Sequence, residues 1–149
     1  MNQNYTFTVP IKPAGKARPR VTRRGTFTPN KTVRIEESIR LFAASSGVRL
    51  IDGPVSLTVD CLFEPPRSWS KKRRQEAIEG ACNHIGKPDA DNVAKLVGDA
   101  LNGIAYKDDS QVAELIVRKA YDAENRIEIK ISPSASRGGI NDRSTPAKP

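Results

Sequence analysis

Five aspartates are concentrated in the segment from Lys87 to Val112, KPDADNVAKLVGDALNGIAYKDDSQV, and Lys95 lies among them: the aspartates are Asp89, Asp91, Asp99, Asp108 and Asp109. Carboxylates that gather at one place repel one another unless a cation lies between them, and oxygen-only ligands favour a hard ion such as Mg²⁺ or Mn²⁺. Such an ion polarises a phosphoryl oxygen and activates a water molecule. The segment is therefore a candidate site for metal-dependent phosphoryl chemistry.

A helix is predicted to position these side chains. It runs from Asp91 to Asn102 and ends at Gly103. On a helical wheel, Asp91, Lys95, Asp99 and Asn102 lie opposite an apolar stripe made of Val93, Leu96, Val97, Ala100 and Leu101. Asp89 and Asp91 are expected on one side of the extended chain that leads into the helix. If the chain then returns antiparallel, Asp108 or Asp109 comes back beside the helix start.

The same residues also fit a purely structural interpretation. An aspartate at a helix start is commonly an N-cap, and either Asp89 or Asp91 fits that role. Asp91, Lys95 and Asp99 have the spacing of an ordinary i, i+4 ion-pair ladder. The Asp108–Asp109 pair fits a solvated turn. Spacing alone leaves these alternatives open.

The rest of the chain predicts one small α+β domain over residues 1–133, in which a mixed sheet carries its helices on one side in two layers. The predicted strands are Tyr5–Ile11, Val55–Phe63, Gln111–Tyr121 and Arg126–Ser132, and the further helices are Asn30–Ser46 and Ser68–Ala81, with Ser70 as a candidate N-cap. Residues 134–149 hold Ile140 as their one large apolar side chain, so we expect a disordered C-terminal tail.

Positive charge is concentrated near the N-terminus. Residues 1–50 hold ten Lys and Arg but only Glu36 and Glu37, so this part accounts for the whole net charge of +8. A basic loop over residues 12–29, with a short hairpin around Arg24-Gly25, predicts contacts with a nucleic acid backbone. The candidate DNA-binding residues are Lys16, Arg18, Arg20, Arg23, Arg24, Lys71, Lys72, Arg73 and Arg74. For both basic runs, a solvated surface is the alternative.

Several classes of protein are disfavoured. Two cysteines provide neither a disulfide framework nor a zinc site, and no apolar stretch approaches the ~20 residues of a membrane helix. The N-terminus resembles neither a signal peptide nor a transit peptide. We therefore expect a cytoplasmic protein that does not contact membranes. His84 is interpreted as a loop residue rather than a general base, and Trp69 as a cover for the core edge rather than a platform for an unpaired base.

The stretch KPDADNVAKLVGDALNG, followed by YKDDSQV, resembles the signature of the RusA-type Holliday junction resolvases, which are crossover junction endodeoxyribonucleases of bacteria and their phages. The dense match covers about a sixth of the chain, with weaker likeness at GKARPR and RGTFTPNKT. The resemblance implies a RusA-like homodimer that depends on Mg²⁺, with Mn²⁺ as a substitute, and that nicks a four-way DNA junction symmetrically.

Carried over by motif position, the catalytic residues are Asp89, Asp91, Lys95 and Asp109. The three aspartates are the implied metal ligands, and Lys95 steadies the scissile phosphate. Asp99 also matches a recurrent family position, and the loop length leaves Asp108 as an alternative to Asp109. The expected dimer interface involves the strand Val112–Tyr121 and the apolar remainder of the helix Asn30–Ser46. A nuclease for flaps or forks, and a non-catalytic DNA-binding protein, are the competing hypotheses.

Overall fold

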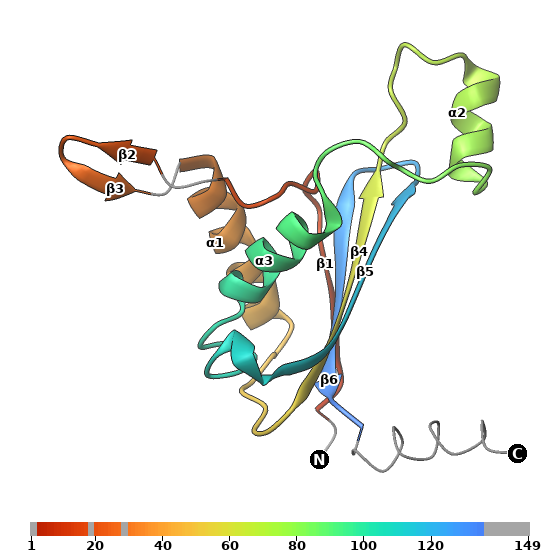
Figure 1. The fold of residues 1–149 in the computed structure, drawn as a ribbon. Helices are drawn as coiled ribbons and strands as arrows, with labels where there is room; N and C mark the ends of the chain where they lie inside the picture. The colour runs from red at the N-terminus through yellow and green to blue at the C-terminus, as the bar shows by residue number, and fades with distance from the viewer. Residues whose placement is uncertain (1–2, 18–19, 28–29, 136–149) are drawn as a thin grey trace, which may run out of the picture.

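A four-stranded mixed sheet forms the centre of the computed structural model, which describes residues 3–17, 20–27 and 30–135 (Figure 1). The strands are β1 (Tyr5–Val9), β4 (Val55–Phe63), β5 (Val112–Tyr121) and β6 (Arg126–Pro133), in the order β1-β6-β4-β5. Strand β4 pairs parallel with β5 and antiparallel with β6, which in turn pairs antiparallel with β1. The predicted mixed sheet is confirmed.

Strand β4 shows how the sequence sets the two faces of this sheet. Every second residue from Val55 to Phe63 is buried, and the residues between them are half-buried. The buried face packs under α1 (Asn30–Ser45) and α3 (Ala90–Ala100), which lie on the same side of the sheet (Figure 1). The opposite face carries polar pairs such as Arg118 with Asp60, whose nearest atoms are 2.6 Å apart. The predicted two-layer arrangement is therefore confirmed.

The core joins both layers. Ile39 and Ala43 of α1 and Leu96 of α3 are buried against the inward residues of β4 and β6. Burial of an aliphatic side chain of this size stabilises the fold by roughly 1.5–3 kcal/mol relative to its exposed state. Arg40 adds a polar link, because its Nε donates to the carbonyl of Ala100 at 2.9 Å and so ties α1 to the end of α3.

Two small elements project beyond this core (Figure 1). Strands β2 (Arg20–Thr22) and β3 (Gly25–Phe27) form the expected hairpin, with Gly25 at a φ of 123°. Helix α2 (Lys71–Ile78) begins after Ser70, whose hydroxyl accepts from the Arg73 backbone N–H at 3.2 Å. The predicted helix Ser68–Ala81 was too long at both ends, because Ser70 caps its start and the chain turns at Gly80.

Other predicted boundaries differ from the observed ones by one or two residues. Strand β1 ends at Val9 because Pro10 has no N–H for the ladder. Gln111 belongs to a short 3-10 helix, η1 (Asp109–Gln111), rather than to β5. Strand β6 ends at Pro133, and the predicted disordered tail lies mostly in residues 136–149, outside the described residues. None of the helices described is long and apolar enough to span a membrane.

Candidate active site

Helix α3 carries the candidate catalytic side chains. Its apolar stripe is buried as predicted, with Val93, Leu96 and Val97 inaccessible to solvent, while Asp91 and Lys95 are exposed. Asp89 occupies the N-cap position with an extended backbone, but its side chain makes no capping hydrogen bond. The carboxylates of Asp89 and Asp91 are therefore both available to a ligand, although Asp89 has the backbone position of a cap.

Asp91, Lys95 and Asp109 line one cavity of about 310 Å³. Its remaining walls are Gly98 and the apolar side chains Leu57, Ala94, Val112 and Leu115. Asp109 lies close to α3, since a Cβ added to Gly98 would be 4.0 Å from the Cβ of Asp109. The chain thus comes back beside the helix as expected. Two carboxylates and one ammonium group therefore line the same cavity.

Tyr106 holds the returning segment against the helix. Its buried hydroxyl donates to the Gly98 carbonyl at 2.8 Å, and its own carbonyl accepts from the Gly103 N–H at 2.7 Å. Burial raises the pKa of Tyr106, and the negative charges of Asp109 and Asp99 raise it further. The phenol therefore stays protonated and keeps donating its hydrogen bond, which fixes the segment that carries Asp109.

The neighbouring Asp108 has a structural role as the cap of η1. Its carboxylate accepts from the Ser110 N–H at 3.0 Å and caps η1, while the Gln111 side chain accepts from the Asp108 N–H. The hydrogen bonds from Ser110 hold the pKa of Asp108 below its usual range. Gln111 also donates to the carbonyls of Ile51 and Gly53, both at 2.9 Å, and so anchors the turn to the start of β4. Of the two adjacent aspartates, Asp109 is the one that lines the cavity.

Asp99 is paired with a lysine from the basic loop. The Lys16 ammonium group lies within ion-pair distance of Asp99 and at 3.4 Å from Glu36. Burial by itself would lower the pKa of Lys16, but the hydrogen bond to Asp99 and the charge of Glu36 outweigh it and raise that pKa. Lys16, a predicted DNA contact, thus makes ion pairs inside the protein. No ion pair joins Lys95 to Asp91 or Asp99, all three being described residues, so the ion-pair ladder that the spacing left open as an alternative does not form.

Asp89 lies on a neighbouring cavity rather than on the one lined by Asp91. Among the described residues, no three His, Cys, Asp or Glu side chains are gathered in a way that could hold a metal ion. Mg²⁺ in proteins commonly uses one or two carboxylates, with waters and substrate phosphates completing its shell. The Asp91–Asp109 pair fits that mode. The three-aspartate ligand set stays a prediction.

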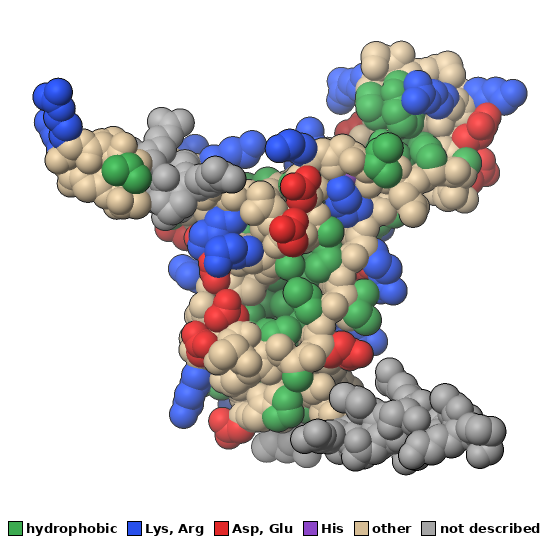
Figure 2. Space-filling view, viewed as in Figure 1, with side chains coloured by type: hydrophobic (Ala, Val, Ile, Leu, Met, Phe, Trp, Pro, Cys, Tyr) green, Lys and Arg blue, Asp and Glu red, His purple; other side chains and the backbone are tan. Residues whose placement is uncertain are grey.

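Basic side chains lie on both projecting elements, on either side of the acidic centre (Figure 2). At the hairpin, Arg23 and Arg24 are exposed; Arg20 belongs to β2, and Arg18 lies outside the described residues. On α2, Lys71, Lys72 and Arg73 are exposed, whereas Arg74 contacts Glu64 at 3.5 Å. This face therefore presents acidic side chains between two basic projections.

An aromatic cluster supports α2. The ring of His84 stacks on Phe63 with centroids 3.7 Å apart and tilts against Tyr121 at 5.4 Å. Burial, together with the charges of Lys119 and Lys12, lowers the pKa of His84 and so favours the neutral ring. Trp69 packs on Tyr121, and the Arg73 guanidinium group lies 3.7 Å from its ring centroid. His84 and Trp69 line neither cavity described here, in agreement with their interpretation as packing residues.

Two residues that fix the segments around the site could not be identified from the sequence. Lys119 of β5 donates to the carbonyls of Gly86 at 2.8 Å and of Pro88 at 3.0 Å, and so fixes the segment that leads into α3. Gln111 fixes the segment that leads into β5. Both contacts join parts of the chain more than 30 residues apart, which no local pattern reveals.

The chain is similar to known proteins over most of its length. The chain matches the family model described as Endodeoxyribonuclease RusA over residues 10–132. It is also 39% identical over 132 residues to "Uncharacterized protein YqaN" of Bacillus subtilis (strain 168), an alignment that covers 84% of this chain and 93% of that protein. The matched region begins after β1 and contains β4, β5 and β6 up to Ser132, both projecting basic elements and the Asp91–Lys95–Asp109 cavity. The chain therefore belongs to the RusA family of endodeoxyribonucleases.

Proposed function

We propose that this protein is a Mg²⁺-dependent, structure-specific endonuclease that resolves Holliday junctions by paired symmetric nicks in DNA recombination and repair. The observation that carries the proposal is the meeting of Asp91, Lys95 and Asp109 at one cavity, on a face whose two projections are basic. Family membership supports DNA hydrolysis as the reaction. Mn²⁺ is the expected substitute for Mg²⁺, since both ions favour oxygen ligands.

In this proposal the carboxylates bind the metal ion and the lysine binds the phosphate. Asp91 and Asp109 would hold the ion, and Asp89, which lines the neighbouring cavity, is the third ligand that the family resemblance implies. The bound ion supplies Lewis acidity at the phosphoryl oxygen and lowers the pKa of an attacking water. Lys95, one helical turn after Asp91, contributes positive charge at the same phosphate. Leu57 and Leu115 add apolar surface to the wall of this cavity.

A homodimer is part of the proposal. A four-way junction has approximate two-fold symmetry, and productive resolution needs two opposed nicks, whereas one chain has one Asp91–Asp109 cavity. Strand β5 supports this proposal because it lies at the edge of the sheet and exposes Ile116 at 39% of its surface.

The test is cleavage of a mobile four-way junction, a 5′-flap, a replication fork and a linear duplex, each with Mg²⁺ and with EDTA. We expect symmetric paired nicks in the junction, with Mg²⁺ only, at a rate well above that on the other substrates. Equal rates on flaps and forks would favour a broader branched-DNA nuclease. Tight junction binding without any cleavage would favour a non-catalytic DNA-binding protein.

A further inference from the structure

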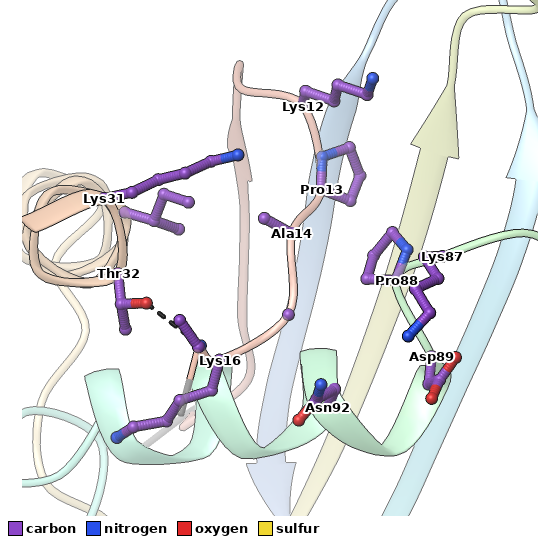
Figure 3. Close-up of a pocket in the computed structure, with 13 residues that line it drawn as sticks. Lys12, Pro13, Ala14, Lys16, Lys31, Thr32, Lys87, Pro88, Asp89 and Asn92 are labelled. Carbon is purple, nitrogen blue, oxygen red and sulfur yellow. Dashed lines mark hydrogen bonds between the residues drawn. The ribbon is translucent and has the colours of Figure 1, made fainter. Parts of the chain in front are cut away.

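A second cavity, of about 480 Å³, is lined in part by the first turn of α3 (Figure 3). We call it the lysine pocket. Residues 12–17 form one wall, Lys31, Thr32 and Ile35 of α1 form the second, and the segment 87–92, through Lys87, Pro88, Asp89 and Asn92, forms the third. Three parts of the chain that are distant in sequence therefore enclose it.

The walls carry an excess of positive charge. Lys12, Lys31 and Lys87 are exposed, and none of their ammonium groups makes a hydrogen bond or ion pair with a described residue. In Figure 3, Lys31 extends from α1 toward the 12–17 segment, and Lys87 lies beside Asp89. Asp89 contributes the one carboxylate among the lining residues, and the fourth lysine, Lys16, is neutralised by Asp99 and Glu36. Unpaired ammonium groups around a concave space favour a phosphate.

The shape of the lysine pocket is fixed by contacts within the protein. The Lys16 N–H donates to the Asn92 carbonyl at 3.3 Å, and the Ala17 N–H donates to the Thr32 hydroxyl at 3.2 Å. Gly15 packs so closely on α3 that a Cβ added there would lie 2.9 Å from the Cβ of Asn92. Since the walls are already tied together, a ligand need not order them on binding.

The lysine pocket and the Asp91–Asp109 cavity share the first turn of α3. Asp89 and Asn92 line the former, while Asp91 and Lys95 line the latter. A single DNA strand that crosses this turn would therefore place one phosphate at Asp91 and a neighbouring phosphate at the lysines.

We propose that the lysine pocket binds a phosphodiester of the cut strand next to the scissile one, and so fixes the position of the cut along that strand. This inference rests on the proposed nuclease function. Because Lys12, Lys31 and Lys87 belong to the binding surface and not to the ion site, their role is measurable without cleavage.

The first test is an NMR titration of ¹⁵N-labelled protein with the dinucleotide TpT, which carries one phosphodiester, and separately with inorganic phosphate. We expect saturable shifts at the amides of Gly15, Ala17 and Asn92. The Lys31→Gln/Lys87→Gln variant should bind TpT at least fivefold more weakly, and Lys130→Gln, which removes a lysine from the open face of β6, should bind like the wild type. Equal affinity in all three proteins, or shifts that never saturate, would overturn the proposal. Binding of inorganic phosphate but not of TpT would also overturn it.

The second test locates the phosphate on the junction. Each phosphate near the cut is replaced in turn by a neutral methylphosphonate, and junction binding is measured in EDTA. One replacement adjacent to the scissile position should weaken wild-type binding but have no further effect in Lys31→Gln/Lys87→Gln. If the methylphosphonate weakens junction binding by the variant as much as it weakens binding by the wild type, the proposal is overturned. Failure of cleavage in Mg²⁺ would instead count against the nuclease function, which this binding measurement does not require.

Discussion

Asp91 and Asp109 line the same cavity, although one lies in the first turn of α3 and the other begins η1. Tyr106 and Gln111 maintain this relationship through hydrogen bonds to Gly98, Ile51 and Gly53. The carboxylate pair therefore depends on the tertiary fold, and its two members should behave alike when changed.

We predict that Asp91→Asn lowers the cleavage rate by more than about 100-fold, since even the outer partners of metal ligands contribute about 10- to 100-fold to activity. Junction affinity should stay the same or rise, because a negative charge next to the DNA phosphates is removed. Single-turnover cleavage and gel-shift binding on one junction check both parts. Cleavage near the wild-type rate would contradict the assignment of Asp91.

The two adjacent aspartates provide a matched pair of variants. Asp109→Asn should abolish cleavage because it removes a carboxylate from the cavity. Asp108→Asn should leave cleavage within about twofold of the wild type, since asparagine is an equally good N-cap and can accept the Ser110 hydrogen bond. The reverse outcome would show that Asp108 is the functional residue.

Much of this site can be predicted from the sequence. There is a physical reason why the remaining parts cannot. The periodicity of β4 and α3 predicts which face of each is buried, because one stripe of apolar side chains must leave water. The separation of Asp89 from Asp91 was not predicted, because the helix begins at Ala90 and so turns the two side chains toward different cavities. The Lys16–Asp99 pair spans 83 residues, and only the tertiary fold brings the two together.

Lys16 should make the stability of the protein depend on pH. Its pKa in the folded protein is raised above the ordinary value of 10.5, so its contribution is fully present below pH 10.5 and is lost as the pH rises through the folded-state pKa. Lys16→Met should lower the free energy of unfolding at pH 8 by up to about 1 kcal/mol. Urea unfolding of both proteins should show this difference narrowing above pH 10.5. A constant difference would mean that the ion pair does not contribute.

Gly15 should tolerate no side chain. Its added Cβ would collide with the Cβ of Asn92, and the cost of displacing the 12–17 segment is roughly 1 kcal/mol. We expect Gly15→Ala to weaken junction binding about fivefold. Gly98→Ala is the matched control for stability: the nearest atoms to its Cβ would be 3.9 and 4.0 Å away, and alanine should stabilise the helix by up to about 1 kcal/mol. Thermal unfolding of both variants distinguishes a local clash from a general effect of alanine, and gel-shift binding of Gly15→Ala measures its effect on junction affinity.

The dimer interface is expected to involve the free edge of β5 and the exposed apolar residues of α1. Ile116 is 39% exposed and Leu41 is 64% exposed, and a stable interface usually buries about 1,200–2,000 Å² in total. We predict that Ile116→Lys and Leu41→Lys shift the protein toward monomers in sedimentation at micromolar concentration, because a buried unpaired charge opposes association.

Val21→Lys is the control for that experiment, since Val21 is 81% exposed on the hairpin and away from both candidate surfaces. It should leave the dimer intact. The monomeric variants should make single nicks in a junction rather than paired ones, because each chain brings one Asp91–Asp109 cavity to the DNA. A wild-type species near 16.3 kDa that still cuts both strands within one binding event would show that a second copy is not needed.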